Sequence, residues 1–159
     1  MVPEEAASFI GRLDPPIVRD VEKGSIRRYA EAVGNENSLY YDVEYARKTK
    51  YEGIIAPPGF FGRAIKPPSA ATGLPDIVVE LQDALRQAGY PRVLDGGISY
   101  EFFIPVRAGD ILVATPKIKN ITEKQGKSGI MMLCQFDVTY VNQNGDVVAN
   151  VTQSFFMLP

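Results

Sequence analysis

The sequence contains no histidine, no tryptophan and a single cysteine. Without histidine there is no imidazole general base, no Ser–His or Cys–His nucleophile pair of the usual kind, and no zinc site built on histidine ligands. Cys134 alone allows neither a disulfide nor a cluster of thiolates, and its apolar segment GIMMLCQFDV indicates a buried core residue rather than a reactive thiol. Several reaction classes are thereby excluded, and we expect neither a metal nor a cofactor.

The chain also lacks a strong charge of either sign and a long apolar run. It has 17 Lys and Arg against 19 Asp and Glu, and the basic residues are scattered, so we expect no nucleic acid partner. No apolar run approaches the ~20 residues that cross a bilayer. The N-terminal segment MVPEEAASFIGRL is acidic where a signal peptide would be basic. We therefore expect a cytoplasmic protein that does not bind membranes.

Length and apolar content are those of one ordinary domain. At 159 residues, of which 45% are hydrophobic, the chain is long enough to bury a full core. We find no internal repeat and no low-complexity tract that would divide it. The sequence predicts a single domain over residues 1–159.

The first part of the chain has the pattern of short helices separated by turns. In SIRRYAEAVG the apolar residues recur at helical spacing, with Ser25 as the expected N-cap and Gly34 as the left-handed residue that ends the helix. Asp42 is expected to cap a second short turn through VEYARK. The pair Pro57-Pro58 is expected to open a helix through GFFGRAI, because the first helical turn needs no N–H from proline.

The clearest helix is predicted over DIVVELQDALRQAG, with Asp76 as its cap. Its apolar stripe consists of Ile77, Leu81, Leu85 and Ala88. From Val93 onward, four runs rich in β-branched and aromatic residues indicate strands: ISYEFFIPV, ILVATPKIKNI, GIMMLCQFDVTYV and DVVANVTQSFFML. Between the last two, Asn144-Gly145 is a strong hairpin signal. Helices followed by long strands predict an α+β protein whose C-terminal half is an antiparallel meander.

Three segments together resemble the N-terminal-type domain of the MaoC-like dehydratase family. They are IRRYAEAVGNENSLYYD, then YEGIIAPPGF, then the linked pair YEFFIPVRAGDIL and NGDVVANVTQSF, within about Val18 to Phe156. The resemblance implies a hot-dog fold, in which a long antiparallel sheet wraps around a central helix and two units lie side by side as a dimer. It further implies an acyl thioester as ligand, carried by CoA or by acyl carrier protein.

The catalytic loop of that family is altered in this sequence. Catalytic members read Gly-Asp-x-Asn-Pro-x-His after the first helix, and the Asp and His hold the water that adds to a 2-enoyl thioester. Gly34 and Asn37 match the motif, whereas Asn35 replaces the Asp, Ser38 the Pro and Tyr40 the His. An amide accepts no proton near neutral pH, and a tyrosine with an ordinary pKa of about 10 is hardly ionised. We therefore expect no intact catalytic residue.

The resemblance also implies a substrate-binding set, which consists of Gly34, Asn37, Pro58, Gly59 and Phe60. In catalytic relatives a backbone N–H at the start of the central helix holds the thioester oxygen, and the matching segment here is APPG from Ala56 to Gly59. Proline has no N–H, so that donor is lost if Pro58 takes the position, although Gly59 could supply one after a small shift.

Three functional hypotheses remain open. The one we favour is a non-catalytic subunit, as in heterodimeric (3R)-hydroxyacyl dehydratases, which shapes the acyl-chain tunnel for a hot-dog partner that carries the Asp and His. Aromatic residues near the expected tunnel support this hypothesis, although any one of them is more often part of the packed core than of a tunnel wall. These are Phe60, Phe61, Tyr90, Tyr100, Phe102 and Phe103.

The second hypothesis is a stand-alone (R)-specific enoyl-CoA hydratase that uses another base. Glu36, Asp42, Glu52 and Asp95 are the carboxylates available. The third hypothesis is a non-catalytic homodimer that binds acyl-CoA without turnover. The cations that could meet the CoA phosphates are Arg63, Lys66 and Arg107.

Overall fold

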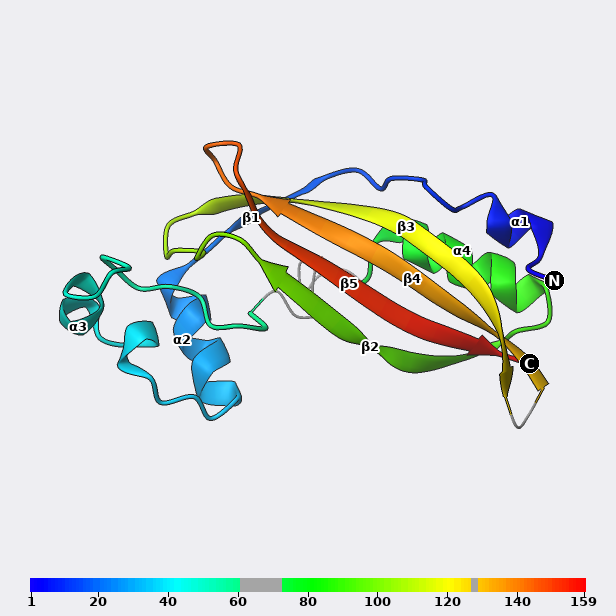
Figure 1. Cartoon of the computed structure of the whole chain (residues 1–159), viewed down its shortest axis with the longest axis horizontal. Helices are drawn as coiled ribbons and strands as arrows, with labels where there is room; N and C mark the ends of the chain where they lie inside the picture. The colour runs from blue at the N-terminus through cyan, green and yellow to red at the C-terminus, as the bar shows by residue number, and fades with distance from the viewer. Residues whose placement is uncertain (61–72, 127–128) are drawn as a thin grey trace.

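A computed structural model describes residues 1–60, 73–126 and 129–159 of the protein. Its main feature is one long, curved antiparallel sheet with strand order β1-β3-β4-β5-β2. Helix α4 (Asp76–Gln87) lies along one face of this sheet, and the shorter helices lie beyond its ends (Figure 1). This arrangement is the one that the family resemblance implies.

The centre of the sheet is the predicted meander. Strands β3 (Ile111–Gly126), β4 (Gly129–Val141) and β5 (Val147–Leu158) pair in sequence order. The expected hairpin joins β4 to β5, and Gly145 adopts the positive φ of +88° that its turn requires. The sequence-based prediction of these three strands is therefore confirmed.

The two outer strands differ from the prediction. Strand β2 (Arg92–Phe102) does not pair with β3, its neighbour in sequence, but crosses to the far edge and pairs with β5. Strand β1 (Ile17–Asp20) forms the opposite edge beside β3, and no strand was expected there. β1 escaped prediction because four residues are too few to show an alternating pattern.

The core lies between α4 and the concave face of the sheet. Alternate residues of β4 are buried on this face, among them Phe136 and Val138, and Leu81 and Leu85 of α4 are fully buried. The predicted apolar stripe of α4 is thus confirmed except at Ala88, which is exposed because it follows the last helical turn. Pro75, rather than Asp76, occupies the N-cap position.

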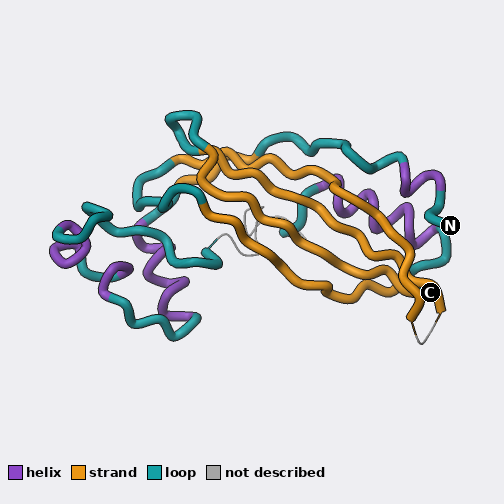
Figure 2. The backbone as a smooth tube through the Cα atoms, in the orientation of Figure 1, coloured by secondary structure: helices purple, strands orange, loops and turns teal. Residues whose placement is uncertain are grey.

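Helices α2 (Lys23–Ala32) and α3 (Val43–Arg47) lie together beyond one end of the sheet, whereas α1 (Glu4–Ala7) lies near the other end (Figure 2). Helix α2 begins earlier than predicted, so Glu22 is its N-cap and Ser25 lies inside its first turn. Gly34, with φ of +66°, follows the end of α2 as predicted. Asp42 caps α3, because its Oδ1 accepts hydrogen bonds from two backbone N–H groups.

The segment after α3 leads toward the sheet without forming a described helix. Residues 58–60 form a turn, and the rest of the helix predicted for GFFGRAI lies outside the described residues. The helix that packs on the sheet is therefore α4, which begins at Asp76. Across the ranges given above, no helix is both long and apolar enough to traverse a bilayer.

Candidate functional site

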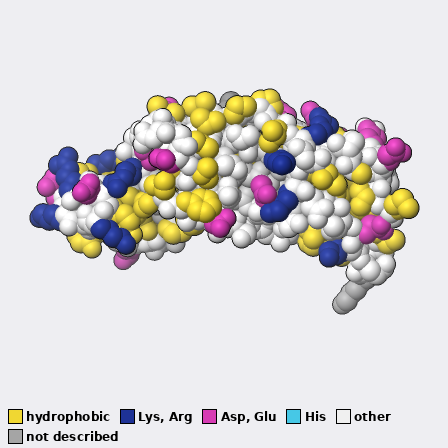
Figure 3. Space-filling view, turned by 45° about the horizontal axis from the view of Figure 1, so that its top comes forward, with side chains coloured by type: hydrophobic (Ala, Val, Ile, Leu, Met, Phe, Trp, Pro, Cys, Tyr) yellow, Lys and Arg dark blue, Asp and Glu magenta, His cyan; other side chains and the backbone are white. Residues whose placement is uncertain are grey.

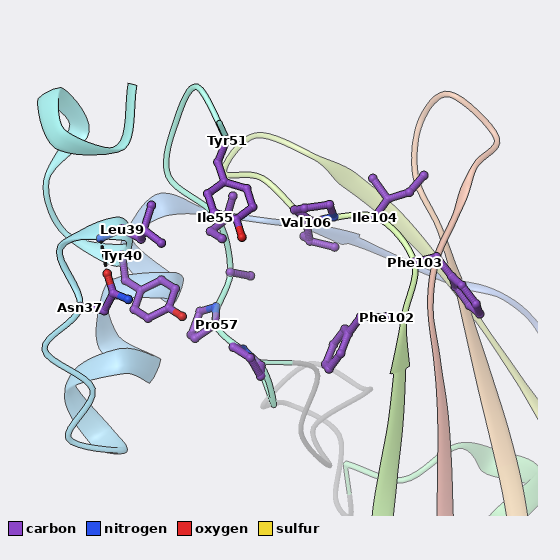
Figure 4. A pocket seen from close by; sticks show the side chains of 13 residues that line it. Asn37, Leu39, Tyr40, Tyr51, Ile55, Pro57, Phe102, Phe103, Ile104 and Val106 are labelled. Carbon is purple, nitrogen blue, oxygen red and sulfur yellow. Dashed lines mark hydrogen bonds between the residues drawn. The ribbon is translucent and has the colours of Figure 1, made fainter. Parts of the chain in front are cut away.

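A cavity of about 480 Å³ lies where the helical end of the molecule meets the end of β2. Three segments line it: the loop after α2, residues 51–58 and the chain that follows β2. Figure 4 shows Asn37 and Tyr40 on one side of the cavity, with Phe102 and Phe103 on the other. The lining is mainly apolar with a few polar groups, which is typical of sites for small molecules.

Tyr40 is the residue of greatest chemical interest in this cavity. It ends the short 3₁₀ helix η1 (Ser38–Tyr40), which Asn37 caps by accepting the Leu39 N–H at 3.0 Å. Only 7% of Tyr40 is exposed. Burial, together with the nearby Tyr51, raises the pKa of its phenol above the ordinary value. The hydroxyl therefore stays protonated at neutral pH, so it can donate a hydrogen bond but cannot serve as a base.

Asn35 is held by the loop rather than directed at the cavity. Its Oδ1 accepts the N–H of Asn37 at 3.2 Å, and its carbonyl oxygen accepts the hydroxyl of Tyr41 at 2.7 Å. Neither Asn35 nor Gly34 is among the described residues that line the cavity. Of the positions matched to the family motif, the structure brings Asn37 and Tyr40 to the site and leaves Asn35 and Gly34 in the supporting turn.

The proline segment contributes a wall with few hydrogen-bond donors. Pro57 and Pro58 line the cavity and have no N–H, while the N–H of Ala56 is used by the carbonyl of Val106 at 2.8 Å. The next N–H along the chain belongs to Gly59. Gly59 has φ of +86°, and a Cβ there would lie 2.5 Å from the Tyr29 hydroxyl. Its backbone angle therefore favours glycine, and any larger residue would have to displace the Tyr29 hydroxyl.

Phe60 lies on the other side of this wall. Its ring meets Tyr29 edge to face, with centroids 5.9 Å apart. Together with Arg19 and Tyr140 it lines a separate cavity of about 270 Å³. Phe60 was predicted to bind substrate, but among the described residues it does not line the 480 Å³ cavity.

The carboxylates considered as alternative bases do not converge on the site. Glu36 and Glu52 are exposed, and Asp42 is engaged in capping α3. Asp95 lies toward the opposite end of β2, in a third cavity of about 210 Å³. None of the four lines the 480 Å³ cavity in the described part of the chain.

Some of the aromatic and cationic candidates line the 480 Å³ cavity, and the others lie elsewhere. Phe102 and Phe103 line the site, and the ring of Tyr100 stacks on Phe102 at 5.6 Å between centroids. Tyr90 packs partly buried against the core after α4. Arg107 is half-buried and donates its backbone N–H to Asp110. Three candidates lie outside the described residues: Phe61, Arg63 and Lys66.

Sequence reasoning missed much of the apolar lining. Leu39, Tyr51, Ile55 and Val106 line the cavity but were not singled out. The motif segments YEGIIAPPGF and YEFFIPV indicated the correct regions. Which of their residues face the cavity depends on how loops meet, and loops have no periodic pattern from which this can be deduced.

Charged side chains gather at the helical end of the molecule (Figure 3). They form exposed pairs within or beside the helices: Arg27 with Glu31, Arg28 with Glu22, and Arg47 with Glu44. Such surface pairs contribute little to stability. Within the described ranges, no group of three potential metal ligands comes together.

Comparisons with known proteins agree with this architecture. Residues 8–151 match the family model described as the FAS1-like dehydratase domain region. A UPF0336 protein of Streptomyces avermitilis is 36% identical over 121 residues, which cover 75% of each chain. A probable enoyl-CoA hydratase alpha subunit of Thermomonospora curvata is 29% identical over 133 residues, which cover 78% of this chain and 40% of that protein.

Two solved structures from Mycobacterium tuberculosis have a similar fold. The ChsH1-ChsH2 complex matches with a TM-score of 0.83 at 18% identity, over 98% of this chain and 95% of the other. The HadBC complex, a (3R)-hydroxyacyl-ACP dehydratase, matches with a TM-score of 0.68 at 19% identity, over 93% and 96% of the two chains. With its family model matched along most of its length, the chain belongs to the FAS1-like dehydratase-region family and has the hot-dog fold of MaoC-like dehydratases.

Proposed function

We propose that the protein is a subunit of a dehydratase or hydratase that interconverts 3-hydroxyacyl and 2-enoyl thioesters. In this proposal it binds part of the acyl chain and lacks the catalytic pair, which a second hot-dog subunit supplies. One observation carries the proposal: the chain builds a substrate-sized cavity and places in it a buried, protonated Tyr40 where the family has histidine.

The chemistry explains why this cavity alone is insufficient. Hydration adds a water oxygen to C3 and a proton to C2, so a group must take a proton from water and another must deliver one. Tyr40 cannot take a proton at neutral pH, and the amide of Asn35 holds the loop. Pro57 and Pro58 also offer no N–H to a developing negative charge on the thioester oxygen. The site therefore supports binding rather than turnover.

The edge of the sheet supports a partner. Within the described part of the chain, strand β2 pairs on one side only, and ten of its eleven residues are exposed. Val93, Leu94, Ile98 and Phe102 are apolar side chains on this edge with 39–56% exposure. Long apolar edge strands are a hazard in a lone protein unless they are covered. We propose that β2 meets a second hot-dog unit, either another copy of this chain or a catalytic subunit, in the cytoplasm.

The two solved structures described above are complexes of two differently named subunits, which favours a heteromeric partner for this chain. A homodimer that holds acyl-CoA without turnover would use the same cavity. Adding a catalytic partner distinguishes the heteromeric subunit from the homodimer. Only the heteromeric subunit is expected to change the activity of another subunit.

The test is hydration of crotonyl-CoA. The purified chain alone is expected to remain at the background rate, since loss of a general acid or base costs about 10² to 10⁴ in rate. Co-expression with a hot-dog subunit that carries the Asp–His pair is expected to give a stable complex with higher activity on long acyl chains than that subunit alone. Robust turnover by this chain alone would overturn the proposal.

Restoring the motif tests the positional match in the same assay. Tyr40→His places an imidazole in the cavity, and Asn35→Asp keeps an acceptor for the Asn37 N–H. We expect weak activity from the double variant and none from either single variant, because such groups act as a unit. Tyr40→Phe is the matched control, since it keeps the ring and adds no base. Activity in either single variant would contradict the match.

A further inference from the structure

The polar groups of the 480 Å³ cavity gather on one side of it. Within the described ranges its polar lining side chains are Asn37, Tyr40 and Tyr51, which we call the donor cluster. Figure 4 shows the hydroxyls of Tyr40 and Tyr51 directed toward the interior of the cavity, with Phe102 across from them. The cavity therefore has one polar side and one apolar side.

The donor cluster presents hydrogen-bond donors to a ligand. Oδ1 of Asn37 already accepts the Leu39 N–H at 3.0 Å, so the part of the amide left for a ligand is its NH₂ group. Neither Tyr40 nor Tyr51 donates its hydroxyl proton to an acceptor in residues 1–60, 73–126 or 129–159. Because a mostly buried donor without an acceptor is costly and uncommon, these two phenols indicate that the acceptor arrives with a ligand.

The two phenols serve the same part of the cavity. Burial, and after it the neighbouring Tyr51, raises the pKa of Tyr40, so the two rings lie close to one another. Tyr40 is 7% exposed and Tyr51 is half-buried. Nζ of Lys50 lies 5.1 Å from the centroid of the Tyr51 ring, where a cation–π contact helps to hold the ring in place.

The rest of the lining adds neither charge nor many further donors. No described residue that lines the cavity is charged, so a ligand carboxylate or phosphate would lose its hydration there without compensation. The N–H groups of Ala56 and Phe103 already bond to the carbonyls of Val106 and Val148. Three lining residues have no N–H at all: Pro57, Pro58 and Pro105.

A ketone is the ligand group that suits this lining. Its oxygen is neutral, accepts two hydrogen bonds and brings no proton that needs an acceptor of its own. A methylene in the same place would leave the hydroxyls of Tyr40 and Tyr51 unpaired. A ligand hydroxyl would bring a proton that the donor cluster could accept only on a phenol oxygen.

We propose that the donor cluster binds a ketone oxygen within the acyl group, and that the protein selects oxo-acyl thioesters over plain ones of the same length. The hydroxyls of Tyr40 and Tyr51 donate to the ketone oxygen, while the methylenes beside it pack against Phe102 and its neighbours on the apolar side. This inference rests on the proposed function, which assigns the acyl chain to this cavity.

Calorimetric titration of the purified protein tests the inference. The ligands are palmitoyl-CoA and a series of its isomers that carry one ketone at successive positions along the chain. We expect the best oxo isomer to bind about five- to tenfold more tightly than palmitoyl-CoA, which corresponds to one net hydrogen bond. Binding of palmitoyl-CoA with no gain from any ketone would overturn the inference and leave the proposed function standing. Failure of every thioester to bind would overturn both.

Removal of the two hydroxyls is the decisive variant. Tyr40→Phe combined with Tyr51→Phe keeps both rings, so the preference for the ketone should fall to about onefold while palmitoyl-CoA binds as before. Tyr51→Phe alone, at the less buried position, should lose part of the preference. Tyr45→Phe, at a position of α3 that is 50% exposed, is the matched control and should keep it.

Two results with the double variant would overturn the assignment. One is a preference for the ketone that persists without the two hydroxyls. The other is an equal loss of affinity for palmitoyl-CoA and for its oxo isomers, because the phenols would then contact the carrier or the plain chain rather than a ketone.

Discussion

Strands β4 and β2 belong to the same sheet, yet they have opposite surroundings. β4 lies between β3 and β5, and every second residue from Met132 to Tyr140 is buried. Among the described residues β2 has a neighbour on one side only, and ten of its eleven residues are exposed while Tyr100 is half-buried. The contrast indicates that the apolar side chains of β4 form the core of this chain, whereas those of β2 are available to contact a partner or a ligand.

The largest expected effect comes from placing the same charge in both strands. Val138→Asp buries a carboxylate at a fully buried position of β4, which should cost more than about 4 kcal/mol and unfold the protein. Val93→Asp lies at a position that is 52% exposed, so it should leave folding nearly unchanged and weaken association. Circular dichroism and sedimentation velocity measure the two effects. Equal loss of folding in both variants would contradict the comparison.

Phenylalanine truncation sharpens the contrast without adding charge. Phe136→Ala leaves a cavity in the core and should lower the free energy of unfolding by about 3–5 kcal/mol. Phe102→Ala, at a position 46% exposed, should cost less than about 1 kcal/mol but reduce palmitoyl-CoA affinity several-fold. Urea denaturation and calorimetry are the measurements. Unchanged acyl-CoA binding by Phe102→Ala would argue against the 480 Å³ cavity as the acyl-chain site.

The smallest effect is a dependence on pH at Cys134 of β4. Burial raises the pKa of this thiol from 9.0 to about 12, so the folded protein keeps it protonated where the unfolded chain ionises. Its stabilising contribution is complete below pH 9 and is lost as pH rises toward 12, with about 2 kcal/mol gone by pH 10.5.

Two variants isolate that contribution. Cys134→Ala should reduce the fall in unfolding free energy between pH 8.5 and pH 10.5, while other titrating groups act equally in both proteins. Adding Ser99→Cys to this variant returns a thiol at an exposed position of β2, where no such fall should reappear. Identical pH profiles for wild type and Cys134→Ala would refute the assignment to this group.

The elements that sequence reasoning found were those with long periodic patterns or unambiguous end signals. The alternation in β3, β4 and β5, the stripe of α4 and the cap at Asp42 were all evident from the sequence. The N-cap of α2 was misplaced to Ser25, because several polar residues precede the first apolar position and the sequence favours none of them strongly. The crossing of β2 to β5 is a tertiary feature that no local pattern specifies.

The candidate site was predictable at the level of segments but not of side chains. The loop from Gly34 to Tyr40 was identified, yet Asn35 uses its amide within the loop while Tyr40 reaches the cavity. In a tight turn a side chain can bond to the backbone two residues on, as Asn35 does with the Asn37 N–H, and the sequence does not show which side chain will do so.

The bulge at Gly96 has an evolutionary consequence. A Cβ at this residue would lie 2.8 Å from Oγ of Ser154 and 3.0 Å from its backbone, so the extra residue is accommodated only as glycine. Gly96 is the unpaired residue between Asp95, opposite Phe155, and Gly97, opposite Ser154, so loss of its codon would restore regular alternation and leave Val93 and Asp95 on the same face as Ile98. A lineage can therefore delete this residue without changing which side chains β2 turns inward, whereas it cannot enlarge it without moving β2 away from β5 at Ser154.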